Sequence, residues 1–376
     1  MRSVNLLFLL ARRLDWSMVG WNGNCISDTD AIDMLAEESV RITCAVSGEP
    51  AEASCRSALL WGRYHAPASP KPEETPFAAA LQSAGYAVQF SGGWNRPEHT
   101  PLSPDAQAEE ALGELDALSR SHAPFALFCD FDAPGDGTLP DLALEDDLAP
   151  FRDRWFRPAP SFGLNVRSVP KGQRLTQDRL AEENERRKVR FAMLSALDRS
   201  VERLLSRVDE LGLARDTLVV FCSDGGLFFG EHGRAGSDWF YEEAVRTPLY
   251  LRQTMTLTPG DVPVCLSSAD MMNTVLSLMN VPVPEKSAGH DFAPAILEGT
   301  ADASPALICG KGYAALREEN FVLCREDKRG TVMLFDLRTD PYQLNDLAKD
   351  AAHARRRREM EHTLNILCPD KHRRKS

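Results

Sequence analysis

One carboxylate stands where a buried strand is expected to end. The apolar run Thr217 to Cys222 leads into Ser223-Asp224 and then into the glycine pair Gly225-Gly226. In parallel α/β sheets, ligands bind outside the carboxyl ends of the strands, so Asp224 lies where it could hold a divalent metal ion. A hard divalent ion needs about six oxygen ligands. Metal chemistry at Asp224 therefore requires further ligands from other parts of the chain.

Thiols and hydroxyls are the other groups that could do chemistry. The nine cysteines are scattered singly, with no C-x-x-C pair, and most lie inside apolar runs, so we expect buried, reduced thiols. Ser54 and Cys55 are candidate nucleophiles, but neither has a general base at an evident spacing. His232, in "GEHG", has no ligand partner nearby in the sequence, and we interpret it as a loop histidine.

Alternating strands and helices are expected to position these residues. Helices are predicted at 30–38, at 76–83, after the N-cap Ser103, and over 178–211 with Gly212 as the C-cap. The alternation predicts an α/β fold with a mostly parallel central sheet flanked by helices. Runs of strand length lie at 4–11, 40–46, 86–90, 125–131 and 217–222.

Two regions depart from this alternation. Residues 134–176 are rich in Pro, Asp and Arg, which predicts a long loop or insertion within an α/β domain spanning residues 1–300. Residues 301–366 carry short apolar runs between polar turns and then a helix from about 351 to 367, which predicts a small C-terminal antiparallel sheet plus helix. A basic tail is predicted for residues 367–376.

Composition limits the classes of function. The 376 residues carry a net charge of -12, which argues against a general nucleic-acid binder. No stretch approaches the roughly 20 apolar residues that cross a membrane. The apolar run 4–11 is followed by Arg12-Arg13 without a small-residue cleavage site, so we predict a first strand and not a signal peptide. We therefore expect a cytoplasmic protein, or an exported one if translation starts further upstream.

Several segments, in order along nearly the whole chain, resemble the sulfatase family of the alkaline phosphatase superfamily. They are "VNLLFLLARRLDWSMVGWNGN", "SCRSALLWGRY", "AGYAVQFSGGWN", "RFAMLSALDRSVERLLSRVDELGL", "DTLVVFCSDGG", "GEHGRAGSDWFYEEAVRTPLYL" and "LFDLRTDPYQLNDLA". The resemblance implies a sulfatase-like α/β fold with a divalent metal, usually calcium, at the strand ends. It also implies a formylglycine nucleophile, made from the cysteine of a C-x-P/A-x-R motif, that attacks a sulfate ester.

The chain departs from the family pattern at the nucleophile and at most metal ligands. Where the first strand should end in two metal-binding aspartates it has Arg12 and Arg13, and the nucleophile's position is Glu52. Ser54 and Cys55 replace the motif's proline and serine, and only Arg56 of the motif remains. None of the nine cysteines begins a C-x-P/A-x-R sequence, so no formylglycine is expected.

The remaining family positions are altered in the same way. The Gly-Lys-Trp-His pattern reads Gly92-Gly93-Trp94-Asn95, so the substrate-binding lysine and the histidine are replaced. Pro134-Gly135 stands for the Pro-His pair, Gly225 follows Asp224 in place of a His or Asn ligand, and Ser237 replaces the sulfate-contacting lysine. Asp224 is thus the one metal-ligand position that survives, and the metal site is expected to be empty.

Charge compensation suggests what the arginines do instead. We expect the Arg12 and Arg13 guanidinium groups to lie near Asp224 and Glu52, taking the space and charge of the metal. Arg56, after a predicted N-cap at Ser54, either anchors its turn by pairing with Glu52 or joins Arg12 and Arg13 in a small anion-binding site for a sulfate or phosphate ester. Glu52, Arg56 and Ser237 are then remnant catalytic positions.

Three functions remain open. The first is a pseudoenzyme, a sulfatase-like protein with a degenerate site, no expected cofactor and a pocket that binds a small anion. The second is an active sulfate or phosphate ester hydrolase with a rearranged, metal-poor site in which Glu52, Ser54 or Cys55 is the nucleophile. The third is a structural or regulatory partner of an active sulfatase, as a homo-oligomer or on a paralogous chain.

Overall fold

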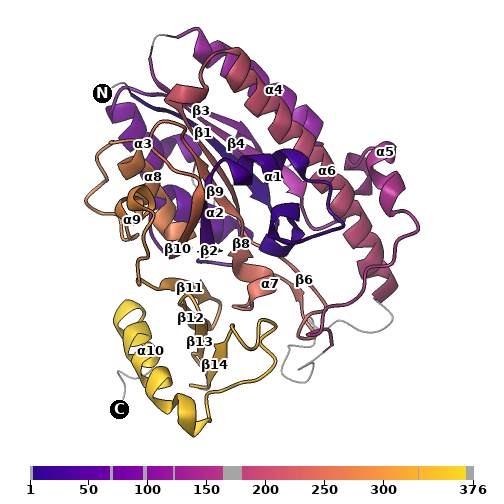
Figure 1. Ribbon diagram of the computed structural model, residues 1–376, viewed down its shortest axis with the longest axis vertical. Coiled ribbons are helices and arrows are strands. Elements are labelled where there is room, and N and C mark those ends of the chain that lie inside the picture. Colours follow the sequence, from indigo (N-terminus) through magenta and orange to yellow (C-terminus); the bar gives the residue numbers. More distant parts are fainter. Residues whose placement is uncertain are drawn as a thin grey trace.

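The computed structural model describes residues 3–67, 71–95, 100–121, 123–163, 180–328 and 330–369, without the side chains of Glu52, Asn95 and Leu180. A central sheet runs through the larger part of the molecule, and a smaller sheet with the C-terminal helix lies at one end (Figure 1). None of the helices in these residues combines the length and apolar character that a bilayer-spanning segment needs.

The central sheet is mixed and mostly parallel, as predicted. Its strand order is β10-β2-β9-β5-β1-β4-β3, with β8 also paired to β2. Strand β1 pairs in parallel with β4 and β5, whereas β9 runs antiparallel between β5 and β2. The bounds are β1 Asn5–Arg12, β2 Val40–Val46, β3 Ala87–Gly92, β4 Phe125–Pro134, β5 Thr217–Ser223, β8 Arg246–Thr247, β9 Leu249–Arg252 and β10 Gly260–Ser267.

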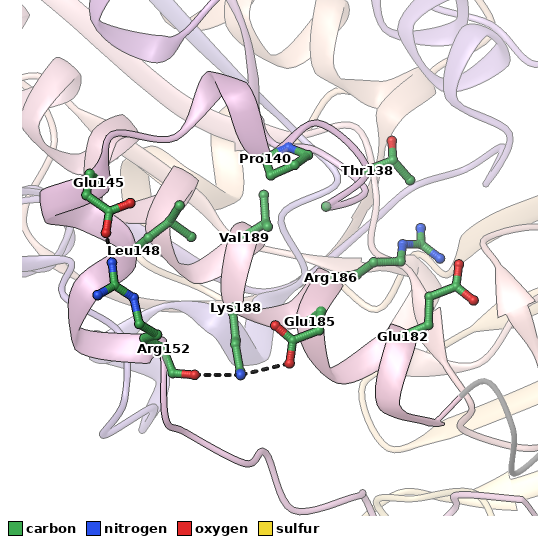
Figure 2. A pocket seen from close by; sticks show the side chains of 11 residues that line it. Thr138, Pro140, Glu145, Leu148, Arg152, Glu182, Glu185, Arg186, Lys188 and Val189 are labelled. Atoms are coloured by element: carbon green, nitrogen blue, oxygen red, sulfur yellow. Dashed lines mark hydrogen bonds and ion pairs between the residues drawn. The ribbon is translucent and has the colours of Figure 1, made fainter.

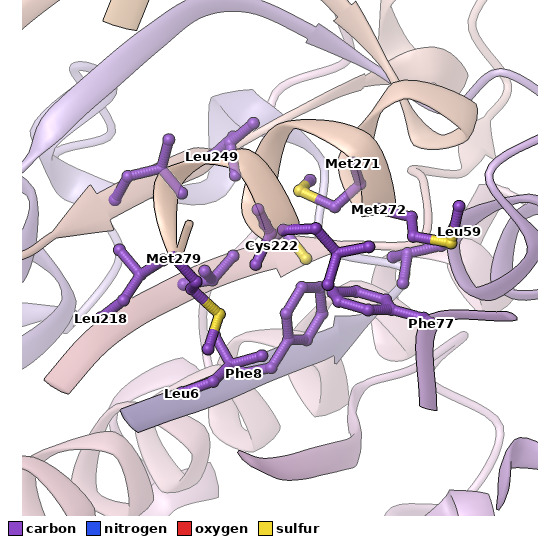
Figure 3. Packing of buried hydrophobic residues seen from close by; sticks show 14 of the residues in the cluster. Leu6, Phe8, Leu59, Phe77, Leu218, Cys222, Leu249, Met271, Met272 and Met279 are labelled. Atoms are coloured by element: carbon purple, nitrogen blue, oxygen red, sulfur yellow. The ribbon is translucent and has the colours of Figure 1, made fainter. Parts of the chain in front are cut away.

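Strand β1 shows why the sheet needs helices on both faces. Alternate side chains of a strand point to opposite faces, and here both sets are apolar: Leu6, Phe8 and Leu10 enter one buried cluster, whereas Leu7, Leu9 and Ala11 enter the other. Figure 3 shows part of the first cluster, in which Phe8 and Phe77 lie beside the methionines of α8. A strand buried on both faces is typical of parallel sheets.

Two groups of helices cover those faces. One cluster contains side chains from α1 Asp30–Glu37, α4 Pro104–Ser119 and α6 Leu180–Glu210. The other contains side chains from α2 Glu52–Trp61, α3 Pro76–Ser83, α8 Met271–Leu278 and α9 Ala293–Glu298. The result is a helix-sheet-helix sandwich.

The local signals for helix ends are confirmed at two places. The Ser103 hydroxyl accepts a hydrogen bond from the Ala106 N–H at 3.3 Å and caps α4. Gly212, just beyond α6, adopts a positive φ of 69°, the left-handed conformation that ends helices. The N-cap predicted at Ser54 is wrong: Ala51 is the N-cap of α2, and Ser54 lies inside the helix.

The C-terminal region forms the small antiparallel sheet that the sequence predicts. Its order is β11-β12-β13-β14, and α10 Ala354–Leu367 packs against it (Figure 1). One face shares a buried cluster with the segment around α7 Glu242–Val245, and the other packs on α10. The strands are β11 Ala306–Gly310, β12 Tyr313–Arg317, β13 Phe321–Glu326 and β14 Val332–Asp336.

The predicted long loop at 134–176 is only partly without regular structure. It holds the short helix α5 Glu145–Leu148 and two single-turn 3-10 helices, at Pro140–Leu142 and Ala149–Phe151. Residues 164–176 lie outside the described residues, as does the predicted basic tail from Asp370 onward.

Candidate functional site

The ends of β1 and β5 are tied together through Ser223 and Asp224. The Arg13 N–H donates to Asp224 Oδ1 at 2.8 Å, and the Leu14 N–H donates to Ser223 Oγ at 3.0 Å. In return, the Asp224 N–H donates to the Ala11 carbonyl at 3.2 Å. Arg13 has a positive φ of 58°, an uncommon conformation for a residue with a side chain. The Asp224 carboxylate therefore fixes a strained turn of the main chain.

The Arg13 side chain points to the position where the family pattern has a sulfate-contacting lysine. Its Nη1 donates to Ser237 Oγ at 2.6 Å and to the Pro50 carbonyl at 3.2 Å. Ser237 Oγ donates to that same carbonyl at 2.9 Å. The structure therefore brings Arg13 and Ser237 together, with Ser237 as a hydrogen-bond partner of Arg13.

Arg12 does not use Asp224 as its ion-pair partner. Arg12 Nη1 lies 2.9 Å from Asp132 Oδ1, on the neighbouring strand β4. The other carboxylate oxygen of Asp132 accepts hydrogen bonds from Gln107 Nε2 at 3.0 Å and from the Leu102 N–H at 3.1 Å. Both oxygens of Asp132 are thus engaged by donors of this chain. Because β1 borders β4 as well as β5, Arg12 reaches a carboxylate of β4, a partner that the sequence analysis did not anticipate.

Arg56 likewise pairs with a β4 carboxylate. Its guanidinium group forms an ion pair with Asp130 Oδ2 and lies 4.7 Å from the centroid of the Trp94 ring. The predicted pairing of Arg56 with Glu52 stays a prediction, because the Glu52 side chain lies outside the described residues. Arg56 is in the second turn of α2, so it is not a helix N-terminal residue.

Gly93, at the position of the family's substrate-binding lysine, is required by the Arg56–Asp130 pair. A Cβ atom at position 93 would lie 2.4 Å from Asp130 Oδ2 and 3.2 Å from Arg56 Nη2. The first distance is far below van der Waals contact, so no side chain fits there while the ion pair stands. The absence of a side chain at position 93 and the presence of the ion pair are therefore sterically linked.

Asp130, Asp132 and Gln107 are site residues that the sequence analysis missed. The signal was present in "CDFDAP", where two aspartates two residues apart end a buried strand and so point to one face. Gln107 of α4 holds both, because its Nε2 donates to the Asp130 carbonyl and to Asp132 Oδ2, each at 3.0 Å.

A fourth arginine, Arg190 of α6, was also missed. It is 1% exposed, donates to the Arg13 carbonyl, and lies 3.5 Å from Asp15 Oδ2. Burial lowers the pKa of Arg190 to about 10 and raises the pKa of Asp15. Its position inside a helix of mixed charge gave no sequence signal that it turns inward.

Cys55 is placed close to Asp224 but is not activated. The thiol is fully buried, and this burial, together with the nearby Asp224 charge, raises its pKa to about 12. Cys55 is therefore protonated at neutral pH. A nucleophilic thiol needs the opposite environment, with cations that stabilise the thiolate.

His232 is a packing residue, in agreement with its interpretation as a loop histidine. Its ring is fully buried and stacks on Tyr241 with 3.6 Å between the centroids. Its Nε2 lies 3.6 Å from Glu243 Oε1. None of the predicted site residues is among these contacts.

A cavity of about 600 Å³ lies between residues 137–152 and the first turns of α6 (Figure 2). Lys188, one of its charged residues, donates from Nζ to Glu185 Oε1 at 2.8 Å and to the Arg152 carbonyl at 2.6 Å. None of Arg12, Arg13, Arg56, Asp224 and Ser237 lines it.

The family model for sulfatases matches residues 118–281. The chain is 24% identical to an ulvan-active sulfatase of Formosa agariphila, over 96% of this chain and 80% of that protein. It is 27% identical to an N-acetylglucosamine-6-O-sulfatase of Bacteroides thetaiotaomicron, over 45% of this chain and 33% of that one. A protein solved with its substrate D-glucosamine-2-N,6-O-disulfate has the same fold, with a TM-score of 0.82 over 99% of this chain and 100% of that chain at 16% identity.

Proposed function

Because the chain belongs to the sulfatase family in sequence and fold, we propose that it is a sulfatase-like pseudoenzyme whose own arginines take the place of the catalytic metal. One observation carries this proposal. At the carboxyl ends of β1, β4 and β5, which we call the mouth of the sheet, three aspartates are engaged by donors of this chain: Asp132 pairs with Arg12, Asp130 pairs with Arg56, and Asp224 accepts from the main-chain N–H of Arg13.

The residues at this mouth do not fit a calcium ion. Calcium takes six to eight oxygen ligands, several of them carboxylates. Here the carboxylates that face the mouth already accept from guanidinium groups and amides: Asp224 Oδ1 from the Arg13 N–H, and both oxygens of Asp132 from donors of this chain. Within the described residues, no group of three or more His, Cys, Asp or Glu side chains is arranged to hold a metal.

The residue at the nucleophile's position also supports an inactive protein. Glu52 stands at its position, and a carboxylate cannot become formylglycine. The neighbouring Cys55 is buried with a raised pKa, and Ser54 lies in the first turns of α2. The alternative of a rearranged hydrolase therefore depends on Glu52 or Ser54 as the nucleophile.

Sulfate-ester binding without hydrolysis is the activity we propose for the mouth. The solved neighbour binds a sulfated glucosamine, and the side chains of Arg12 and Arg13, at the end of β1, and of Arg56, on α2, are half-buried. An incoming sulfate would compete with Asp130 for Arg56 and with Ser237 for Arg13. We therefore expect weak binding, because each new charge-assisted bond replaces an existing one.

Calorimetry and thermal melting with calcium, together with hydrolysis of 4-nitrophenyl sulfate and phosphate, test this function. We expect no heat of calcium binding, no calcium-dependent rise in melting temperature and no turnover. D-glucosamine-2-N,6-O-disulfate, used as the probe in the same calorimeter, should bind and be recovered intact. Turnover by the wild-type chain that is abolished by Glu52→Gln would overturn the pseudoenzyme and establish the rearranged hydrolase.

A pair of double variants tests whether the arginines replace the metal. Arg12→Asp with Arg13→Asp gives the mouth the acidic pair of the family pattern, and Arg12→Met with Arg13→Met removes only the cations. Both should lose about 3–5 kcal/mol of stability, because Asp132 is left buried without its partner. Millimolar calcium should restore the melting temperature of the aspartate variant alone, through binding to the folded state. Equal responses of the two variants would contradict the replacement.

A further inference from the structure

A second site, outside the sheet mouth, is formed by two cysteines of the C-terminal region. Cys309 lies on β11, and Cys368 follows the last turn of α10. Both belong to the apolar layer between the small sheet and α10, in which Cys309 is buried and Cys368 is half-buried. Their thiols lie within hydrogen-bonding reach of each other. Two residues 59 positions apart in sequence thus present adjacent sulfur atoms, one of which solvent can reach.

We propose that Cys309 and Cys368 form a redox-active pair that small disulfides convert into an intrachain disulfide, with Cys368 as the attacking thiol. This inference is independent of the sulfatase-like site. It assigns a modification site to the C-terminal helix and would link α10 covalently to β11 (Figure 1).

Charges around Cys368 favour its thiolate. The end of α10 is held by Arg325 of β13, which donates to the Cys368 carbonyl at 3.0 Å and to Asn365 Oδ1 at 2.6 Å. The hydrogen bond from Cys309, and then the charges of Arg325 and His65, lower the pKa of Cys368 to about 6, against burial and the charge of Asp327. The same hydrogen bond raises the pKa of Cys309. One thiol is thus ready to attack while the other keeps its proton.

Glutathione disulfide would oxidise the two thiols in two exchange steps. The Cys368 thiolate attacks one sulfur of glutathione disulfide, forms a mixed disulfide and releases one glutathione thiolate. Cys309 then loses its proton and attacks Cys368 Sγ, which releases the second glutathione. Two protein thiols are oxidised and one glutathione disulfide is reduced to two glutathione molecules. His65, whose Nδ1 lies 3.3 Å from Glu49 Oε1, is among the charges that act on Cys368.

A second cysteine pair in the same chain provides a matched comparison. Cys44 and Cys265 are in register on the parallel strands β2 and β10, and their thiols also share a hydrogen bond. Both are buried within the central sheet and away from solvent. The two pairs therefore differ in solvent access, and of these four cysteines only Cys368 can be the first thiol to meet a soluble disulfide.

The test is treatment of the full chain with glutathione disulfide at pH 7, followed by alkylation of the remaining thiols and peptide mass mapping. We expect a Cys309–Cys368 cross-linked peptide that dithiothreitol reverses. Cys309→Ala should leave glutathione on Cys368, Cys368→Ser should abolish the cross-link, and the control Cys44→Ser should leave it unchanged. A chain in which glutathione appears on the exposed Cys25 only, or in which Cys44 and Cys265 are the linked pair, would overturn the proposal.

A measurement on the wild-type chain avoids dependence on variants that fail to fold. The rate of Cys368 alkylation by iodoacetamide, followed from pH 5 to 8, should reach half of its plateau near pH 6, since the thiolate is the reactive form. A Cys368 that stays unreactive up to pH 8 would refute its role as the attacking thiol.

Discussion

The faces of the central sheet and its mouth are held together by different kinds of interaction. On the faces, Phe8, Phe77 and Phe128 pack with Leu and Met side chains from several helices, and no single atom is essential to the arrangement. At the mouth, Arg12, Arg56 and their aspartates form a few contacts, each of which depends on one atom. Packing tolerates gradual change, whereas a polar site changes its chemistry with one or two residues. A fold can therefore outlast the reaction that it once supported.

Removing an aromatic side chain from the face should have the largest effect. Phe128 is fully buried and contacts the rings of Phe8, Phe77 and Phe90 at centroid distances of 5.4, 5.1 and 4.8 Å. Phe128→Ala should lower the free energy of unfolding by about 3–5 kcal/mol, through lost burial and the cavity left behind. Urea denaturation measures this loss. A loss below that of Arg12→Met with Arg13→Met would invert the comparison between face and mouth.

A smaller effect is expected from adding one carbon at the mouth. Gly93→Ala places a Cβ against Asp130 Oδ2 and should cost about 1–3 kcal/mol by overpacking. Gly113→Ala is the matched control, since no atom lies within 4 Å of the added carbon and alanine favours the α4 helix. Urea denaturation of both variants, and of Gly93→Ala combined with Arg56→Met and Asp130→Ala, tests the steric link. If Gly93→Ala lowers the free energy of unfolding by the same amount in that combination as it does alone, the steric link is refuted.

The smallest change in stability is expected for Asp198, a carboxyl group of a helix that covers one face, and this change should depend on pH. Asp198 of α6 accepts from the Ile32 and Ala31 N–H groups at 2.8 and 3.1 Å, and burial raises its pKa to about 7. Because the folded state then holds a proton that the unfolded state releases, this group's contribution to stability falls as pH rises from about 4 to about 7. Asp198→Asn removes that fall.

Thermal melting from pH 5 to 8 measures the difference. The melting temperature of the wild type should decline relative to Asp198→Asn by about 1–2 °C per kcal/mol of lost stability. Asp116→Asn is the control, because its hydrogen bond from Arg207 lowers the pKa of Asp116, so any loss of stability lies below pH 4. Parallel melting curves of wild type and Asp198→Asn across this range would mean that Asp198 is ionised in the folded protein.

The fold was predictable because its signals are periodic and repeated. The apolar runs at 40–46 and 217–222 became β2 and β5 within one residue, and the helix at 76–83 was predicted to the residue. Each signal is spread over many residues, so one misleading position does little harm. The antiparallel direction of β9 was not predicted, because a run of four buried residues carries no information on strand direction.

The site was predictable only in part. Position along a family pattern named Arg13, Asp224 and Ser237 as site residues, and the structure links them by hydrogen bonds near the strand ends, which meet at one edge of the sheet. The pairing of Arg12 with Asp132 and of Arg56 with Asp130 was not predicted, because an arginine side chain is long enough to reach carboxylates of several elements. Only spatial strand order, which places β4 beside β1, decides between them.

In the proposed pseudoenzyme, Asp224 is a metal-ligand position of the family that a main-chain contact keeps occupied. Its Oδ1 holds the main chain of Arg13 in a left-handed turn, and this contact works equally well in an enzyme and in a protein without a reaction. Selection for a correctly folded chain would then preserve this aspartate after selection for turnover has ended. Among distant members of such a lineage, a surviving aspartate at this strand end records the history of the backbone and is a poor guide to which members still cleave an ester.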